Sequence, residues 1–473
     1  MERIKLPFRI RAGYGLGQVA AGAPFNLFFI YFVFFLTAVA GVSPAIAGTI
    51  SLIVLIVDAL VVPFAGALSD NYVTEKGRRL PWMKATILPM AILLALLFAP
   101  FELGTVAIQM VYYILLGVAL WVIYAGYQVP YFALVTEITA DYAERNNLRG
   151  INISVGYFIT MLATSGPMWI WVWAGTNGFS DRDAWGITGV VFAGLIVVGG
   201  ILCLVMLRGC EAESIKVALA EKKEKVKENF FKIWGGCFKI RSFRKVAIWL
   251  FLYATGLSIG TTVFVHTMTF NAGMTLAQQG VYWIPYCLFI MATIPFYTFL
   301  ANKIGKKATL IIVLGAGAAI ATALFFTGMT SIVHMYIYGL LVGSAIGCFY
   351  TFYIGLAYDC VEINEYQTGN RDEGSMIGLT LFMMKLGTAL GMFIAGVLLQ
   401  ITGFDGEVFE QTPEALRGII LTCLIVPSIF TAVSLVVLST YKVNIKNFNA
   451  LVDALEKKRA GEEYSDEEFK EIL

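Results

Sequence analysis

Residues 50–70 read ISLIVLIVDALVVPFAGALSD, an apolar run that contains one carboxylate, Asp58, before it ends at Asp70. As a helix, a run of this length crosses a hydrocarbon core about 30 Å thick. An ionised carboxylate in hydrocarbon is costly unless it is paired or protonated, so a membrane helix that carries one usually uses it. The stretch therefore predicts a transmembrane helix with a functional acid at its centre.

The rest of the chain has the composition of a polytopic membrane protein. Of its 473 residues, 58% are hydrophobic and 14% are charged, and the mean hydropathy is +0.76. No soluble globular domain keeps this balance over such a length. Apolar windows predict twelve spans, at residues 12–39, 45–69, 82–100, 105–135, 149–173, 184–207, 245–269, 276–301, 307–328, 332–358, 375–402 and 416–440.

The distribution of basic residues predicts the orientation. With a cytoplasmic N-terminus, all 34 lysines and arginines except Arg182, Lys385 and Arg417 fall on the cytoplasmic side. The positive-inside rule thus predicts that both termini are cytoplasmic, in what we expect to be a bacterial plasma membrane. The seven cysteines form no CxxC pair, so we expect neither disulfides nor a metal site. We expect His266 and His334 to lie at the membrane interface.

The two halves of the chain resemble each other. Phe8-Arg9 opens the first span and Phe243-Arg244 opens the seventh, while GALSDNYVTEKGRR after span two returns weakly as ANKIGKK after span eight. A parallel duplication of six helices is the interpretation, with a substrate cavity between the halves. We predict an all-α membrane protein with an N-terminal half at 1–207, a cytoplasmic linker at 208–244, a C-terminal half at 245–440 and a cytoplasmic tail at 441–473, the tail being a solvated helix.

Three stretches carry a resemblance to a known family. They are DALVVPFAGALSD with the GRR that follows, VPYFALVTEITADYAERNNL after span four, and DCVEINEYQTGNRDEGSMIGLTLFMMKLGTALG from span ten into span eleven. Together they resemble the glycoside-pentoside-hexuronide:cation symporters, the melibiose-permease type of the major facilitator superfamily. The resemblance implies a twelve-helix carrier of a small glycoside, sugar or related polar solute that works by alternating access. It implies no enzyme activity, no cofactor and no nucleic-acid partner, and a monomer among membrane lipids.

The sequence departs from that family at its acids. Asp58 matches the first of two aspartates that the family has in span two. Val62 stands where the family has the second, Gln128 where it has the acid of span four, and Gly22 where it has the sugar-binding acid of span one. A neighbouring family threonine falls at Ala125. Because a bare metal cation needs several oxygen ligands, the absence of these carboxylates favours a proton over sodium as the coupling ion. We expect Asp58 and Lys385, a mid-span lysine that needs a counter-charge, to carry the coupling.

Residue type and depth in the membrane indicate which side chains contact the solute and which gate its path. Sugars present hydroxyls at their edges and CH groups on their faces, so amides, an ammonium and aromatic rings suit them. The substrate candidates are Asn26, Trp121, Tyr124, Gln128, Phe132, Tyr350, Tyr353 and Lys385. The gating candidates, at cytoplasmic helix ends, are Asp70, Arg78, Arg79, Glu137, Asp141, Arg145, Asp359, Glu365 and Arg371.

Three alternatives stay open at this point. Transport could be uncoupled, with Asp58 only balancing Lys385. The cargo could be an organic anion or amphipathic solute held by Lys385. The chain could also be a membrane receptor or enzyme without transport, although no HExxH motif, Ser-His-Asp arrangement or Cys/His cluster lies at a plausible depth.

Overall fold

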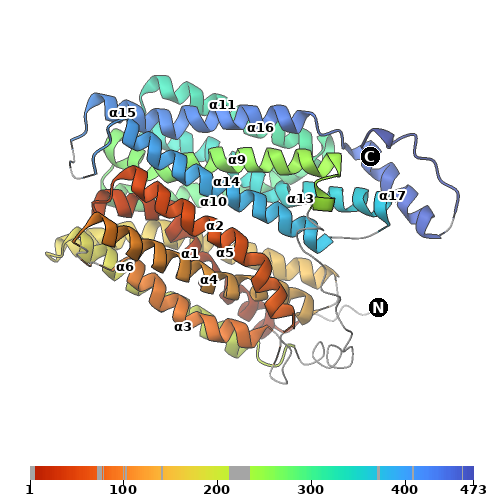
Figure 1. Cartoon of the computed structure of the whole chain (residues 1–473), viewed down its shortest axis with the longest axis horizontal. Helices are drawn as coiled ribbons and strands as arrows, with labels where there is room; N and C mark the ends of the chain where they lie inside the picture. The colour runs from red at the N-terminus through yellow and green to blue at the C-terminus, as the bar shows by residue number, and fades with distance from the viewer. Residues whose placement is uncertain are drawn as a thin grey trace.

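The computed structural model describes residues 6–71, 77, 79–99, 101, 104–139, 142–211, 235–369, 373–406, 408, 410–460 and 462–472. Twelve helices in this part are long and apolar enough to cross a membrane, which confirms the predicted number. They form two groups, with the N-terminal half below and the C-terminal half above in Figure 1. Both chain ends lie at the same end of the molecule, which we call the terminal end; the opposite end is the far end.

The helix bounds follow the apolar runs closely. The N-terminal half contains α1 Phe8–Phe34 with the π-helical η1 Phe35–Val39, α2 Pro44–Asn71, α3 Leu80–Leu97, α4 Val106–Ile138, α5 Tyr142–Thr176 and α6 Asp181–Met206. The C-terminal half contains α9 Arg241–His266 with η2 Thr267–Asn271, α10 Leu276–Ile304, α11 Lys306–Thr327, α12 Ile332–Ile337 with η3 Tyr338–Val342 and α13 Gly343–Thr368, α14 Glu373–Ile401, and α15 Pro413–Ile420 with η4 Leu421–Ile425 and α16 Val426–Ser439. Residues 212–234 of the predicted linker lie outside the described part, so its limits stay a prediction.

The first spans of the two halves end in the same way at the far end. α1 runs into η1 and α9 runs into η2, each a π-helical segment of five residues. His266, the last residue of α9, lies 3.0 Å from the Thr37 hydroxyl through its Nε2 and packs edge-on against Phe34 and Phe404. His266 is therefore fully buried between the halves at the end of its helix, and its depth relative to the membrane interface stays a prediction. His334 is only half-buried.

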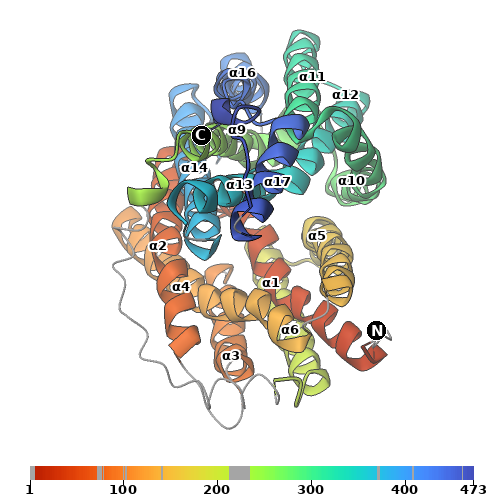
Figure 2. The same ribbon diagram turned by 90° about the vertical axis from the view of Figure 1, so that its right-hand side faces the viewer.

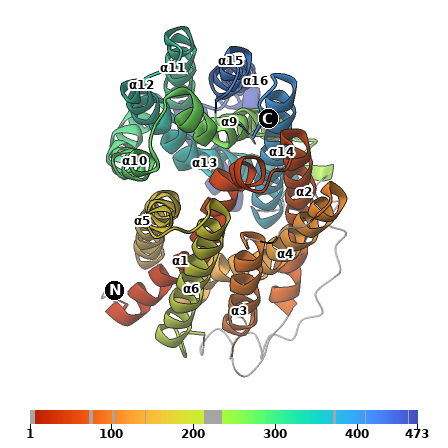
Figure 3. The same cartoon turned by 90° about the vertical axis from the view of Figure 1, so that its left-hand side faces the viewer.

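Two long helix pairs join the halves. α2 packs along α14 and α5 along α10, which the views along the molecule show from both ends (Figure 2 and Figure 3). Toward the far end, Gly48 faces Gly396 so closely that a Cβ on Gly48 would lie 2.9 Å from the Phe393 carbonyl oxygen. Glycine at both positions lets the two backbones touch there.

The tail differs from the solvated helix expected of it. α17 (Ile445–Ala460) and the short η5 (Lys470–Ile472) follow α16, and Leu451 and Phe469 are completely buried against the C-terminal half. The Ser242 hydroxyl, in the first turn of α9, donates to the Ile472 carbonyl at 2.8 Å. The expectation failed because the apolar face of α17 has a partner surface that the sequence alone does not reveal.

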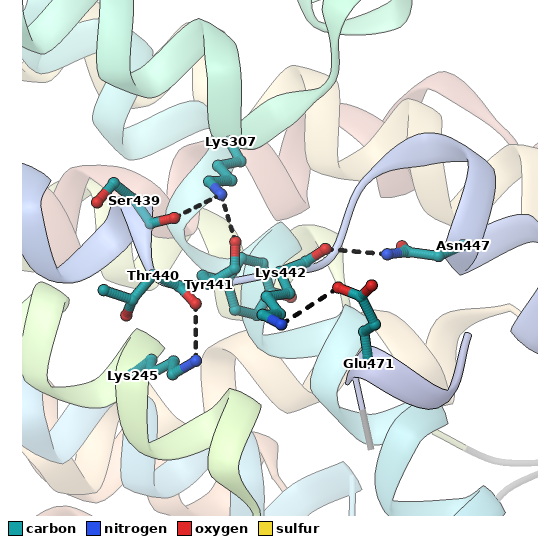
Figure 4. Close-up of polar contacts among 8 residues, drawn as sticks. All are labelled: Lys245, Lys307, Ser439, Thr440, Tyr441, Lys442, Asn447 and Glu471. Carbon is teal, nitrogen blue, oxygen red and sulfur yellow. Dashed lines mark hydrogen bonds and ion pairs between the residues drawn. The ribbon is translucent and has the colours of Figure 1, made fainter. Parts of the chain in front are cut away.

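Lysines fix the segment between α16 and α17, as Figure 4 shows. Lys245 donates to the Thr440 carbonyl at 2.7 Å, and Lys307 donates to the carbonyls of Ser439 and Tyr441. These ammonium groups satisfy carbonyls that a helix end leaves unpaired and complement its negative pole. Lys442 pairs with Glu471 at 3.2 Å, so the end of the tail lies beside the segment where the tail begins.

Phe469→Ala should lower the free energy of unfolding by about 3 kcal/mol, the usual cost of deleting a buried phenyl ring. The measurement is thermal or denaturant unfolding of the purified protein in detergent. Glu467→Ala, two residues away and exposed, is the matched control and should be neutral. Equal stability of the two variants would mean that the tail is not bound to the bundle.

Candidate substrate and coupling site

Asp58 and Lys385 form a buried ion pair in the middle of the bundle. Each lies near the midpoint of its helix, α2 or α14, roughly 20 Å from the ends of α2 at 1.5 Å per residue. Lys385 Nζ lies 2.5 Å from Asp58 Oδ2, and the side chains are 15% and 1% exposed. The other oxygen of the carboxylate, Oδ1, is buried and has no hydrogen-bond partner in the described part of the chain. The pair joins the two halves, as the sequence predicted.

An aromatic wall from the N-terminal half borders this pair. Lys385 Nζ lies 5.9 Å from the centre of the Trp121 ring on α4, within the range of a cation–π contact. Trp121 is buried edge-on against Tyr124, with ring centres 4.8 Å apart, and against Phe28 of α1 at 5.1 Å. The indole Nε1 is buried and has no hydrogen-bond partner among the described residues. Trp121 and Tyr124 thus lie beside the charged pair, where the sequence analysis placed them.

Three phenols of α4 hold that helix against α1. Tyr124, Tyr127 and Tyr131 donate to the carbonyl oxygens of Ala21, Gly17 and Tyr14 at 2.9, 3.0 and 2.6 Å. Their spacing of three and four residues puts them on one face of α4. Gly17 is required there, because a Cβ would overlap the ring of Tyr131. We call these residues the phenol ladder.

The two amide candidates lie on the two helices that the phenol ladder joins. Gln128 Nε2 donates to Tyr124 Oη at 2.9 Å, and Asn26 Nδ2 donates to the Gly22 carbonyl at 2.8 Å. Both candidates are half-buried. A second pair of amides, Gln18 and Asn152, was not predicted from the sequence; Asn152 donates both to Gln18 and to the phenol of Tyr131. The regular Tyr124-Tyr127-Tyr131 spacing was the signal that could have located it.

The remaining aromatic candidates lie apart from the charged pair. Tyr350 and Tyr353 of α13 pack with Phe349 in the C-terminal half, with ring centres 5.1 and 5.2 Å from that phenyl. Phe132 is 44% exposed beside Tyr131. Within the described residues, no ring contact or hydrogen bond links these three side chains to Trp121, so the structure brings together only part of the predicted substrate set.

The gating candidates that the structure describes pair within their own half. Arg79 Nε lies 2.8 Å from Glu137 Oε1 at the terminal end of α4, and Asp359 of α13 lies 2.6 Å from Lys306 Nζ. Glu365 is half-buried near the end of α13. Arg78, Asp141 and Arg371, and the side chains of Asp70 and Arg145, lie outside the described part of the chain.

Glu211, which the sequence analysis did not single out, completes the Arg79 cluster. Its carboxylate accepts from the backbone amides of Arg79 at 2.6 Å and Leu80 at 3.4 Å, so it anchors the start of α3 from the end of α6. Burial raises the pKa of the Glu211 carboxyl, the Arg79 and Leu80 amides oppose that shift, and the neighbouring Glu137 adds to it. A carboxyl directly after a span end was the only hint in the sequence.

The ion pairs of the described residues thus divide into two kinds. Those at the terminal end, including Arg11 with Glu144 at 2.9 Å, join segments of one half or of the tail. Asp58 with Lys385 is the pair that crosses between the halves. The structure thus has two six-helix units that pack through α2 with α14 and α5 with α10 and share a charged pair at mid-depth, an arrangement typical of secondary transporters.

Comparison with known proteins identifies the family. The model of the MFS/sugar transport protein family matches residues 13–445, which is nearly all of the membrane domain. The chain belongs to this family of transporters, and it is an integral membrane carrier rather than an enzyme. The resemblance to the glycoside symporters and the major facilitator fold are thereby confirmed.

Relatives match over almost their full length. The glucuronide carrier protein homolog of Escherichia coli is 26% identical and aligns over 96% of this chain and 97% of its own. The isoprimeverose transporter of Lactiplantibacillus pentosus is 23% identical, with 97% and 93% covered. The crystal structure of the nucleoside transporter NupG superposes with a TM-score of 0.60 at 15% identity, over 94% of this chain and 98% of that one, and so supports the fold.

Proposed function

We propose that this carrier moves a small neutral glycoside or related sugar across a bacterial plasma membrane by alternating access, coupled to protons through Asp58. The observation that carries the proposal is the Asp58–Lys385 pair, which ties the halves together beside Trp121. The names of the similar carriers, for isoprimeverose and glucuronide, support a sugar-like cargo.

The charge balance of the site favours a neutral solute. Lys385 is the cation beside Trp121, and its ammonium is already neutralised by Asp58 at 2.5 Å. A uronate would have to displace the Asp58 carboxylate and leave it unpaired in a dry environment, which is costly. An organic anion at Lys385 is therefore the second candidate, favoured only if the pair opens when substrate binds.

The same pair favours a proton over sodium. Asp58 contributes one carboxylate, and Val62, one turn further along α2, has no oxygen ligand to add. A metal cation would gain too few oxygens to replace its hydration shell, whereas a single acid can take up and release a proton. Lys385 donates to Asp58 in this arrangement, and we expect the ammonium to move away when the acid takes up a proton.

We infer that the terminal end is cytoplasmic, from the positive-inside rule. The far end, where His266 and Gly396 lie at contacts between the halves, then faces the opposite side of the membrane.

The test is counterflow in proteoliposomes loaded with unlabelled sugar. Labelled isoprimeverose and lactose should exchange faster than a methyl glucuronide, and an inward proton gradient should drive accumulation while a sodium gradient should not. Preference for the glucuronide would favour the anion candidate instead. Exchange of no sugar at all would refute the glycoside carrier.

A further inference from the structure

The pair Gln18 and Asn152 is a polar unit that the coupling site does not use. Asn152 Nδ2, on α5, donates to Gln18 Oε1 of α1 at 3.1 Å and to Tyr131 Oη of α4 at 2.6 Å. Tyr131 gives its own hydrogen to the Tyr14 carbonyl at 2.6 Å, so its oxygen is an acceptor for the amide. One network therefore joins three helices of the N-terminal half and fixes the orientation of both amides.

This network leaves polar atoms unused. Both amide hydrogens of Asn152 are committed, so its Oδ1 is an acceptor, and Gln18 Nε2 keeps two hydrogens. Neither atom has a hydrogen-bond partner in the described part of the chain, and both side chains are half-buried rather than covered. A donor and an acceptor thus lie side by side at fixed positions.

Two glycines lie beside the free donor. A Cβ on Gly156 of α5 would lie 3.3 Å from Gln18 Nε2, and a Cβ on Gly22 of α1 would lie 3.7 Å from it. A methyl group on Gly156 would therefore press on the amide, whereas one on Gly22 would make an ordinary contact with the amide and a tight one, 3.1 Å, with Ile159. Gln18, Gly22 and Asn26 follow one another at intervals of four on α1, so the unit lies on the same helix face as the Asn26 candidate, about 12 Å closer to the terminal end.

We propose that Gln18 and Asn152 form a second sugar subsite that recognises a pair of neighbouring hydroxyls, and so set which glycosides the carrier accepts. A sugar hydroxyl both donates and accepts, so two vicinal hydroxyls satisfy the Gln18 donor and the Asn152 acceptor together. The Tyr131 phenol holds the amides in place before the solute arrives, which lowers the ordering cost of binding. This subsite rests on the proposed function, because it takes the ring of a glycoside as its ligand.

The experiment measures binding of isoprimeverose, lactose and their singly deoxygenated derivatives to purified protein by calorimetry. Wild type should bind one or more derivatives about tenfold more weakly than the parent, the usual effect of losing one well-placed hydrogen bond. Gln18→Ala and Asn152→Ala should bind the parent about tenfold more weakly and no longer distinguish it from that derivative. Gln18→Glu keeps the acceptor for Asn152 but removes the free donor, so it should behave like Gln18→Ala.

Ser154→Ala, on the exposed side of α5 with its hydroxyl bonded to its own helix, is the control and should match wild type. If the variants lose thermal stability but keep the wild-type preference among derivatives, the amides only hold helices together and the subsite is refuted while the proposed function stands. If wild type binds none of these sugars, the proposed function and the subsite both fail.

Discussion

Asp58→Asn should abolish uphill accumulation of sugar and leave downhill exchange at a measurable rate. The amide has nearly the shape of the carboxylate and can still accept a hydrogen bond from Lys385, but it cannot take up or release a proton. Coupling requires a group that changes its protonation with the transport cycle, and Asp58 is the buried acid at the contact between the halves. The measurement is uptake of labelled isoprimeverose into vesicles with and without an inward proton gradient.

The control for this substitution is Ser51→Ala. Ser51 is buried on α2 two turns from Asp58, and its hydroxyl bonds only the Ala47 carbonyl of its own helix at 2.9 Å. This variant should still concentrate the sugar. An Asp58→Asn protein that concentrates sugar as wild type does would rule out Asp58 as the coupling acid. Indifference of the wild type to the proton gradient would instead favour a uniporter in which Asp58 only balances Lys385.

The fold could be predicted because the membrane restricts the choices. An apolar run of span length has to form a helix that satisfies its own backbone, so each run predicts one element. The errors lie at boundaries and outside the membrane: α9 begins at Arg241 rather than 245, and the tail packs where a solvated helix was expected. A helix at the surface can pack against the protein or remain in water, whereas an apolar run in lipid forms a spanning helix. The surface against which α17 packs is assembled from distant segments.

The candidate site could be predicted only where charge singled out a residue. Asp58 and Lys385 are 327 positions apart, yet few other charges lie at mid-depth, so their pairing followed from electrostatics alone. Amides and phenols carry no such signal. Gln18 and Asn152 meet because α1 packs against α5, with Tyr131 of α4 bonded to Asn152, and a single sequence does not reveal which polar face of a helix meets another. For the same reason the sequence did not reveal that Tyr350 and Tyr353 pack in an aromatic group apart from Trp121.

Lys385→Ala should destabilise the protein by about 3–5 kcal/mol, because it leaves the Asp58 carboxylate buried without its partner. Asp58→Ala should do the same to the ammonium of Lys385, although less, since that side chain is 15% exposed and reaches toward Trp121. The double variant removes both charges, so no unpaired ion remains, and its loss of stability should be well below the sum of the two single losses. Unfolding free energies of the four proteins in detergent give the coupling energy directly. Strictly additive losses would mean that the two charges do not stabilise each other, and the link between the halves would then have to rest on packing of α2 against α14 alone.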